Sequence, residues 1–243
     1  MTAASAAIDH RPDWRCYVSE ALGTFALVAI GPGAAMVAAK TGAFGHSGVA
    51  LAFGLAVALI VAATGHLSGA HINPAVTLGF WSVRRFPARD VLPYVLAQCV
   101  GAVAASALLN WLLGAVGNSG ATVPSVTLDR AFAIEMGYTG LLGFVIMAVA
   151  TDDRAPGTTA PFVLGATVFV GALVTGPLTG GSFNPGRSLG PAGLENVWTA
   201  HWLYWVAPIL GMIAGMQCYE VVRRARVRSV APREVATGVE GPL

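Results

Sequence analysis

The feature that most constrains this chain is an Asn-Pro pair set in apolar sequence, within Gly181-Ser182-Phe183-Asn184-Pro185-Gly186-Arg187-Ser188. Proline cannot continue a helix from the preceding turn, but it is favoured at the first position of a new helix. Asn184 is therefore predicted to be the N-cap of a short helix that begins at membrane depth. The irregular backbone before it is tolerated there only if it is buried in protein or lines a water-filled cavity. Arg187 lies one turn into this helix, and a charge at such depth indicates a functional site.

Composition indicates that the surrounding sequence belongs to an integral membrane protein. The chain has 243 residues, of which 55% are hydrophobic and 11% are charged, whereas soluble domains carry about 25% charged residues. A membrane-spanning helix takes about 20 apolar residues, and suitable stretches lie at 21–39, 47–66, 91–113, 131–150, 160–177 and 202–222. With half-helices at 73–81 and 184–193, they predict an all-α membrane protein with six transmembrane helices and two re-entrant half-helices.

The Asn-Pro pair occurs twice, which indicates an internal duplication. Ser68-Gly69-Ala70-His71-Ile72-Asn73-Pro74-Ala75-Val76-Thr77 again places small residues before Asn-Pro, and Glu20 and Glu135 precede the two pairs at nearly the same separation. Paired hydrophobic segments interrupted by Gly and Pro point to a membrane binding site. We expect a channel domain at 17–225, with repeats at about 17–115 and about 129–225, between tails at 1–16 and 226–243.

Basic residues predict the orientation. Six spans place both termini on one side, and 11 of the 14 Lys and Arg residues share it: Arg11, Arg15, Arg84, Arg85, Arg89, Arg154, Arg223, Arg224, Arg226, Arg228 and Arg233. The positive-inside rule makes that side cytoplasmic. It also explains the Arg run that follows the last span as a membrane-edge anchor, so the run does not indicate a nucleic-acid-binding site. Short loops in an Ala-, Arg- and Val-rich chain favour a bacterial inner membrane. Because each half has three spans, the second repeat is inverted and the half-helices meet N-terminus to N-terminus.

Opposed half-helices favour a pore for neutral solutes. Each helix N-terminus carries about half a positive elementary charge, so their meeting point repels cations. Asn73 and Asn184 are expected to cap their helices through the carboxamide oxygens and to offer both amide groups as donors to the cavity. A water held by two donors cannot readily relay a proton, and Arg187 adds a fixed positive charge near the extracellular mouth.

Nothing in the sequence points to catalysis, a metal or a cofactor. It holds no nucleophile paired with a base, no phosphate-binding loop and no cluster with metal-ligand spacing. Cys16, Cys99 and Cys218 are too widely spaced for a metal site or a disulfide framework. The expected partners are membrane lipid, water and small neutral solutes.

These motifs resemble those of the aquaporin, or major intrinsic protein, family over nearly the whole core, from Glu20 to Val222. They are Ser-Gly-x-His-x-Asn-Pro-Ala-Val-Thr, Ser-x-Asn-Pro-x-Arg-Ser-x-Gly-Pro and a Glu near the start of each repeat. The resemblance implies a passive water channel that assembles as a homotetramer with one pore per subunit. It also implies pore motifs at Asn73-Pro74-Ala75 and Asn184-Pro185-Gly186, and a selectivity constriction formed by four residues: Phe53, Ala172, Gly181 and Arg187.

The constriction departs from narrow, water-specific members of the family, which have His at the position of Ala172. Ala172 and Gly181 remove bulk and a donor, so we expect a wider constriction that also passes glycerol, urea or similar solutes. A strictly water-selective channel stays open as an alternative, because three residues resemble the water-selective branch: Ser188, Tyr204 and Trp205. Gly186 replaces the usual Ala, at a cost of about 1 kcal/mol in helix propensity.

Four titratable residues allow more than one interpretation. Glu20 and Glu135 are either proton carriers or, as we favour, acceptors for the re-entrant loop of their own repeat. His66 and His71 flank the first half-helix and either gate it by protonation or, as we favour, support it. Two rival functions follow: a proton-coupled secondary transporter that uses a Glu, and a non-conducting structural homologue whose centre has collapsed at Gly186.

Overall fold

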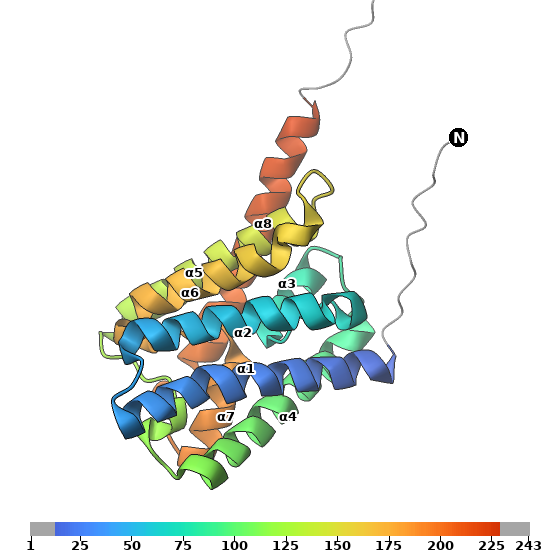
Figure 1. Ribbon diagram of the computed structural model, residues 1–243. Helices are drawn as coiled ribbons and strands as arrows, with labels where there is room; N and C mark the ends of the chain where they lie inside the picture. Colours follow the sequence, from blue (N-terminus) through green and yellow to red (C-terminus); the bar gives the residue numbers. More distant parts are fainter. Residues whose placement is uncertain (1–12, 229–243) are drawn as a thin grey trace, which may run out of the picture.

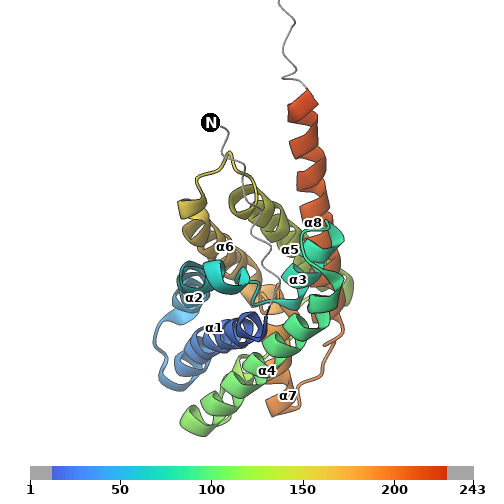
Figure 2. The same ribbon diagram turned by 90° about the vertical axis from the view of Figure 1, so that its right-hand side faces the viewer.

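The computed structural model describes residues 13–228 and confirms an all-α membrane architecture. Within this described part, six helices are long and apolar enough to cross a membrane: α1 (Trp14–Thr41), α2 (Gly45–Ser68), α4 (Ala88–Leu113), α5 (Leu128–Ala150), α6 (Ala160–Thr179) and α8 (Leu203–Arg228). Two shorter helices, α3 (Pro74–Ser82) and α7 (Pro185–Glu195), stand where the half-helices were predicted. Short 3-10 turns lie in the connecting loops at Gly117–Gly120 and Gly157–Thr159. Figure 1 shows α1, α2, α5 and α6 roughly parallel, with α8 rising steeply past them, and Figure 2 shows several of the helices nearly end-on around a common centre.

Helix packing follows the inverted duplication. The most extensive contacts join α5 with α8, α2 with α6 and α1 with α4. The α1–α4 and α5–α8 pairs are equivalent in the two halves, while α2–α6 joins the halves. Each half-helix packs on the last helix of the other half, α3 on α8 and α7 on α4. The centre of the fold is therefore built from both halves at once.

Glycines allow the equivalent helix pairs to approach at their backbones. A Cβ atom on Gly101 of α4 would lie 2.1 Å from the carbonyl oxygen of Ala21. A Cβ on Gly211 of α8 would lie 2.1 Å from the carbonyl oxygen of Met136. Small residues are the usual means of close helix packing in membranes, and here they act at the same place in both halves.

The helices at both ends of the described chain are longer than predicted. α1 begins at Trp14, inside the expected 1–16 tail, because the Asp13 side chain accepts a hydrogen bond from the Arg15 amide at 2.8 Å and caps the helix. α8 continues to Arg228, beyond the apolar span and the expected domain end at 225. Arginine is a good helix former, so a helix need not end where its apolar face ends. The rest of both expected tails, 1–12 and 229–243, lies outside the described residues.

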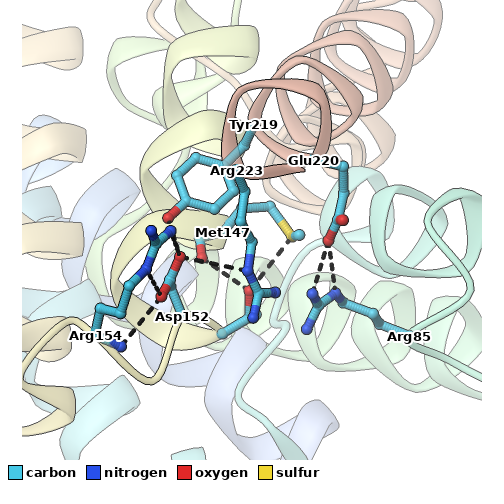
Figure 3. Close-up of polar contacts among 8 residues, drawn as sticks. Arg85, Met147, Asp152, Arg154, Tyr219, Glu220 and Arg223 are labelled. Carbon is cyan, nitrogen blue, oxygen red and sulfur yellow. Dashed lines mark hydrogen bonds and ion pairs between the residues drawn. The ribbon is translucent and has the colours of Figure 1, made fainter. Parts of the chain in front are cut away.

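A buried carboxylate ties the loop after α5 to α8 (Figure 3). Asp152 accepts hydrogen bonds from Nε and Nη2 of Arg154, at 2.8 and 2.5 Å, and from the Tyr219 hydroxyl at 2.6 Å. The Arg154 guanidinium holds the pKa of Asp152 well below its usual range. A second ion pair, between Arg85 and Glu220 at 2.7 Å, joins α8 to the segment after α3. Two connecting segments are thus fastened to one end of α8.

Candidate functional site

Both half-helices begin at an Asn-Pro pair, which confirms the predicted caps. Asn73 and Asn184 are extended, with φ of −160° and −150°, and the proline after each is the first helical residue. The Asn73 side-chain oxygen accepts a hydrogen bond from the Ala75 amide at 2.8 Å. The Asn184 oxygen accepts from the amides of Gly186, at 3.0 Å, and Arg187, at 3.2 Å. Each cap satisfies amides that the helix itself leaves unpaired.

Each asparagine amide group already donates one hydrogen bond within the protein, which corrects the expectation that both groups are wholly available to the cavity. Asn73 Nδ2 donates to the Phe183 carbonyl at 2.8 Å, and Asn184 Nδ2 donates to the Ile72 carbonyl at 2.8 Å. Each amide has two N–H groups, so one fastens the opposite loop and one is left over. The two halves are joined at the centre by this reciprocal pair of hydrogen bonds.

Glu20 holds the loop before α3 by four hydrogen bonds. Its Oε1 accepts from the Ser68 hydroxyl at 2.7 Å and the His71 amide at 2.9 Å. Its Oε2 accepts from the Ile72 amide at 2.6 Å and from Gln98 Nε2 at 2.8 Å. The side chain is fully buried, and a buried carboxylate is tolerated when its oxygens are satisfied in this way.

Glu135 repeats the arrangement in the second half. Its Oε1 accepts from the Thr179 hydroxyl at 2.6 Å and the Ser182 amide at 3.0 Å, and its Oε2 accepts from the Phe183 amide at 2.9 Å. Glu135 is also fully buried. The geometry of both carboxylates matches the acceptor role that we favoured.

These contacts hold backbone that is otherwise strained. Ile72 and Phe183 have φ of 44° and 53°, in the left-handed region that non-glycine residues, and β-branched ones especially, avoid. The carboxylate of Glu20 or Glu135 binds the amide of each residue, while the opposite asparagine binds its carbonyl. Such strain persists only where surrounding contacts over-determine the conformation.

The two candidate histidines lie in different surroundings. His71 is buried, its Nδ1 lies 3.1 Å from the Thr77 hydroxyl, and its ring stacks on Phe80 with centroids 4.8 Å apart. His66 is exposed near the end of α2, and no hydrogen bond links it to the half-helix within residues 13–228. The contacts of residues 13–228 thus give His71 a place beside the half-helix, whereas support by His66 stays a prediction.

Phe53 of α2 and Arg187 of α7 face each other. The guanidinium carbon of Arg187 lies 4.8 Å from the centre of the Phe53 ring, and its Nη1 donates to the Gly120 carbonyl at 2.8 Å. Arg187 is only 4% exposed, and its Nε finds no partner in the described part of the chain. A buried guanidinium with an unused N–H is equipped to bind an oxygen of a passing molecule.

Two cavities meet at this pair. One, of about 100 Å³, is lined by Gly181, His71 and both capping asparagines, and the other, of about 210 Å³, is lined by Ala172 and the loop before α5. Phe53 and Arg187 line both cavities. The four predicted constriction residues thus lie around this junction, where Ala172 contributes a methyl group and Gly181 no side chain.

Other contacts at the site were not predicted from the sequence. The Tyr94 hydroxyl donates to the Ser68 carbonyl at 2.9 Å, and the Tyr204 hydroxyl donates to the Thr179 carbonyl at 2.7 Å. These are equivalent contacts in the two halves, so comparing the repeats position by position could have paired them. The hydrogen bond from Arg187 to the Gly120 carbonyl had no such signal in the sequence, because every residue has a backbone carbonyl.

Gly186 sits at the contact between the two half-helices. A Cβ atom there would lie 3.3 Å from Cδ of Pro74, which is tight but not a severe overlap. The half-helices meet with the asparagine bonds intact, so the missing methyl group has not collapsed the centre.

Comparisons with known proteins agree with this geometry. The family model described as Major intrinsic protein matches residues 7–219. Aquaporin NIP1-1 of Zea mays is 43% identical over 208 residues, which cover 85% of this chain and 74% of the relative. Nodulin-26 of Glycine max is 41% identical over 208 residues, which cover 85% of this chain and 77% of the relative. The X-ray structure of the aquaglyceroporin from Plasmodium falciparum matches with a TM-score of 0.82 at 27% identity, covering 89% of this chain and 99% of that one.

These relatives correct one expectation and confirm others. The similar sequences named above come from plants, so the bacterial origin that composition favoured is not supported. The matches do confirm the resemblance seen in the motifs, and with it a channel protein in place of an enzyme. Because the family model spans most of the sequence, the chain belongs to the major intrinsic protein family, which includes the aquaporins.

Proposed function

We propose that this chain is a passive channel for water and for small neutral solutes such as glycerol or urea, and that it excludes protons and ions. The relatives named as aquaporins and the matching structure of an aquaglyceroporin support both kinds of cargo. The observation that carries the proposal is the cavity junction at Phe53 and Arg187, where Ala172 and Gly181 leave two sides without bulk. What remains is one aromatic face and one guanidinium, which suits a solute with an apolar side and a hydroxyl or amide side.

The half-helices provide the barrier to protons. The free N–H of Asn73 and that of Asn184 bind the oxygen of a water at the centre, and both helix dipoles oppose a cation there. Arg187 repels cations again at the junction. Glu20 and Glu135 hold the two loops and do not carry protons, because backbone and hydroxyl donors already occupy their oxygens.

The residues that resemble the water-selective branch do not narrow the junction. Ser188 hydrogen-bonds Ser182 and Thr122, at 2.5 and 2.9 Å, and Tyr204 holds the Thr179 carbonyl. These contacts support the loops behind the pore wall. Solutes are excluded by size at the narrowest point, so we favour the wider selectivity over a strictly water-selective channel.

The family resemblance supports a homotetramer with one pore per subunit, and the distribution of basic residues supports cytoplasmic termini. In this proposal, repeats at about 17–115 and about 129–225 form each pore in a multi-pass plasma membrane protein. Native mass spectrometry from mild detergent tests the assembly, and a dominant monomer or dimer would contradict it.

The function is tested by stopped-flow light scattering of proteoliposomes with water, glycerol and urea side by side. Wild type is expected to pass all three, and Ala172→His to lose glycerol and urea flux while keeping water flux, because the imidazole narrows the junction. Phe162→His, at a position of α6 that is 75% exposed, controls for adding a histidine to this helix. If wild type passes water but neither solute, the channel is strictly water-selective. A proton leak that scales with water flux would contradict the proposed exclusion.

A further inference from the structure

The wall that α6 gives to the 210 Å³ outer cavity has almost no side chains. Ala172, Gly176 and Gly180 follow one another at helical spacing and all line this cavity. This leaves space beside the Phe53–Arg187 pair that α6 itself does not fill. The structure fills part of it from another helix.

His46, in the first turn of α2, reaches across to α6. Its Nε2 lies 2.8 Å from the Leu173 carbonyl oxygen, and because a carbonyl only accepts, Nε2 carries the hydrogen. In a regular helix this carbonyl would accept from the residue four positions later, which is Pro177 and has no N–H. The imidazole therefore replaces the hydrogen bond that the proline removes.

The ring lies in the space that Gly176 leaves open. A Cβ atom on Gly176 would be 2.5 Å from Cε1 of His46, a distance that real Cβ atoms do not reach. His46 is thereby placed beside the cavity by two features of α6, an unpaired carbonyl and a missing side chain. It lines the same cavity as Arg187 and Ala172.

The bond to Leu173 also sets the chemistry of the ring. With the hydrogen on Nε2, the neutral imidazole keeps Nδ1 as an acceptor, and Nδ1 has no hydrogen-bond partner within residues 13–228. Arg187 lines the same cavity, and its guanidinium carries only N–H donors. A molecule in the outer mouth thus meets an acceptor on α2 and a donor on α7.

We propose that His46 is a specificity-determining residue of the outer mouth, which limits solute size and accepts a hydrogen bond from a small polyol or amide before it reaches Phe53 and Arg187. The imidazole supplies from α2 the bulk and polarity that Ala172 does not supply from α6. The favoured solutes carry both hydroxyl or amide donors and an oxygen acceptor. This inference rests on the proposed function and assigns part of its selectivity.

The test is a flux series in proteoliposomes of the full chain, with water, glycerol and the larger polyol erythritol. His46→Ala is expected to raise the ratio of erythritol to glycerol flux several-fold, because the ring no longer limits the mouth. His46→Phe keeps the ring but loses both nitrogens, so it is expected to lower glycerol flux while erythritol stays excluded. His46→Gln, which retains an amide donor and an acceptor, is expected to restore glycerol flux toward wild type. Ser47→Ala, at an exposed neighbour, is the matched control, and its unchanged water and glycerol flux reports that a substitution at this end of α2 leaves the channel intact.

Two results would overturn the inference: a His46→Ala channel with the size limit of wild type, or a His46→Phe channel with wild-type glycerol flux. A folding defect can be told apart from a change in selectivity, because it lowers water flux and solute flux together. In that case the ratio of glycerol flux to water flux in His46→Gln tests the inference, which requires this ratio to stay near that of wild type. If wild type excludes both glycerol and urea, the proposed wider selectivity fails on its own. The inference then still requires His46→Ala to admit a solute that wild type rejects.

Discussion

Replacing Glu20 by Gln tests whether its carboxylate has a structural role or carries protons. Gln places an NH₂ group where one carboxylate oxygen stood, and at the Oε2 position this group faces the Ile72 amide and Gln98 Nε2. Gln98 can rotate its amide, because its Oε1 has no hydrogen-bond partner within residues 13–228, but the Ile72 amide is fixed in the backbone and cannot move away. Leaving one buried donor unpaired costs roughly 1–3 kcal/mol. By the scaling for domains of 150–250 residues, the melting temperature should fall by roughly 2–12 °C.

The assay is thermal unfolding in detergent, followed by water and proton flux in proteoliposomes at equal amounts of folded protein. Glu135→Gln is the matched comparison, because its NH₂ group at the Oε2 position faces one fixed donor, the Phe183 amide. We expect the two variants to lose similar stability, and neither to alter the dependence of solute flux on a pH gradient.

The opposite pattern would refute this reasoning. If wild type took up solute in response to a proton gradient, and Glu20→Gln abolished that uptake without loss of stability, Glu20 would be a coupling site and the channel proposal would fail. A Glu20→Gln variant as stable as wild type in every condition would show that the four hydrogen bonds do not hold the loop.

Three further predictions concern other parts of the molecule. Arg187→Ala should let cations or protons through while water flux stays similar or rises, and unchanged ion exclusion in a vesicle pH assay would contradict this role. Gly211→Ala should cost about 1–3 kcal/mol, because its Cβ meets the Met136 carbonyl. Gly137→Ala, whose Cβ would meet no atom of another element within 4 Å among residues 13–228, should not destabilise the protein in the same unfolding assay. Asp152→Asn should lower the melting temperature at neutral pH. Arg154 keeps the pKa of Asp152 low in the folded protein, so the stabilisation by this carboxylate is complete above the unfolded pKa of about 3.9. The difference in melting temperature between wild type and Asp152→Asn should therefore shrink as the pH falls below about 4. A difference that stays constant with pH would argue against the ion pair.

Much of the fold could be predicted from the sequence because its signals are local. The lengths of the apolar stretches define the spans, and Asn73-Pro74 and Asn184-Pro185 define where the half-helices start, since capping and the geometry of proline involve only neighbouring residues. The buried positions of Glu20 and Glu135 followed in the same way, because a carboxylate inside an apolar span must find donors. Local signals are weaker at chain ends, where α1 and α8 extended past the expected limits.

The tertiary structure alone decided which groups meet. The bond from Asn73 to the Phe183 carbonyl, the bond from Arg187 to the Gly120 carbonyl and the reach of His46 to Leu173 each join segments far apart in the chain. Backbone carbonyls carry no residue signature, and a side chain such as His66 or His71 is buried or exposed according to which way its segment faces in the packed bundle. The sequence thus determined where each half-helix begins and which charges must be satisfied, whereas packing of the two inverted halves determined what lines the cavities between them.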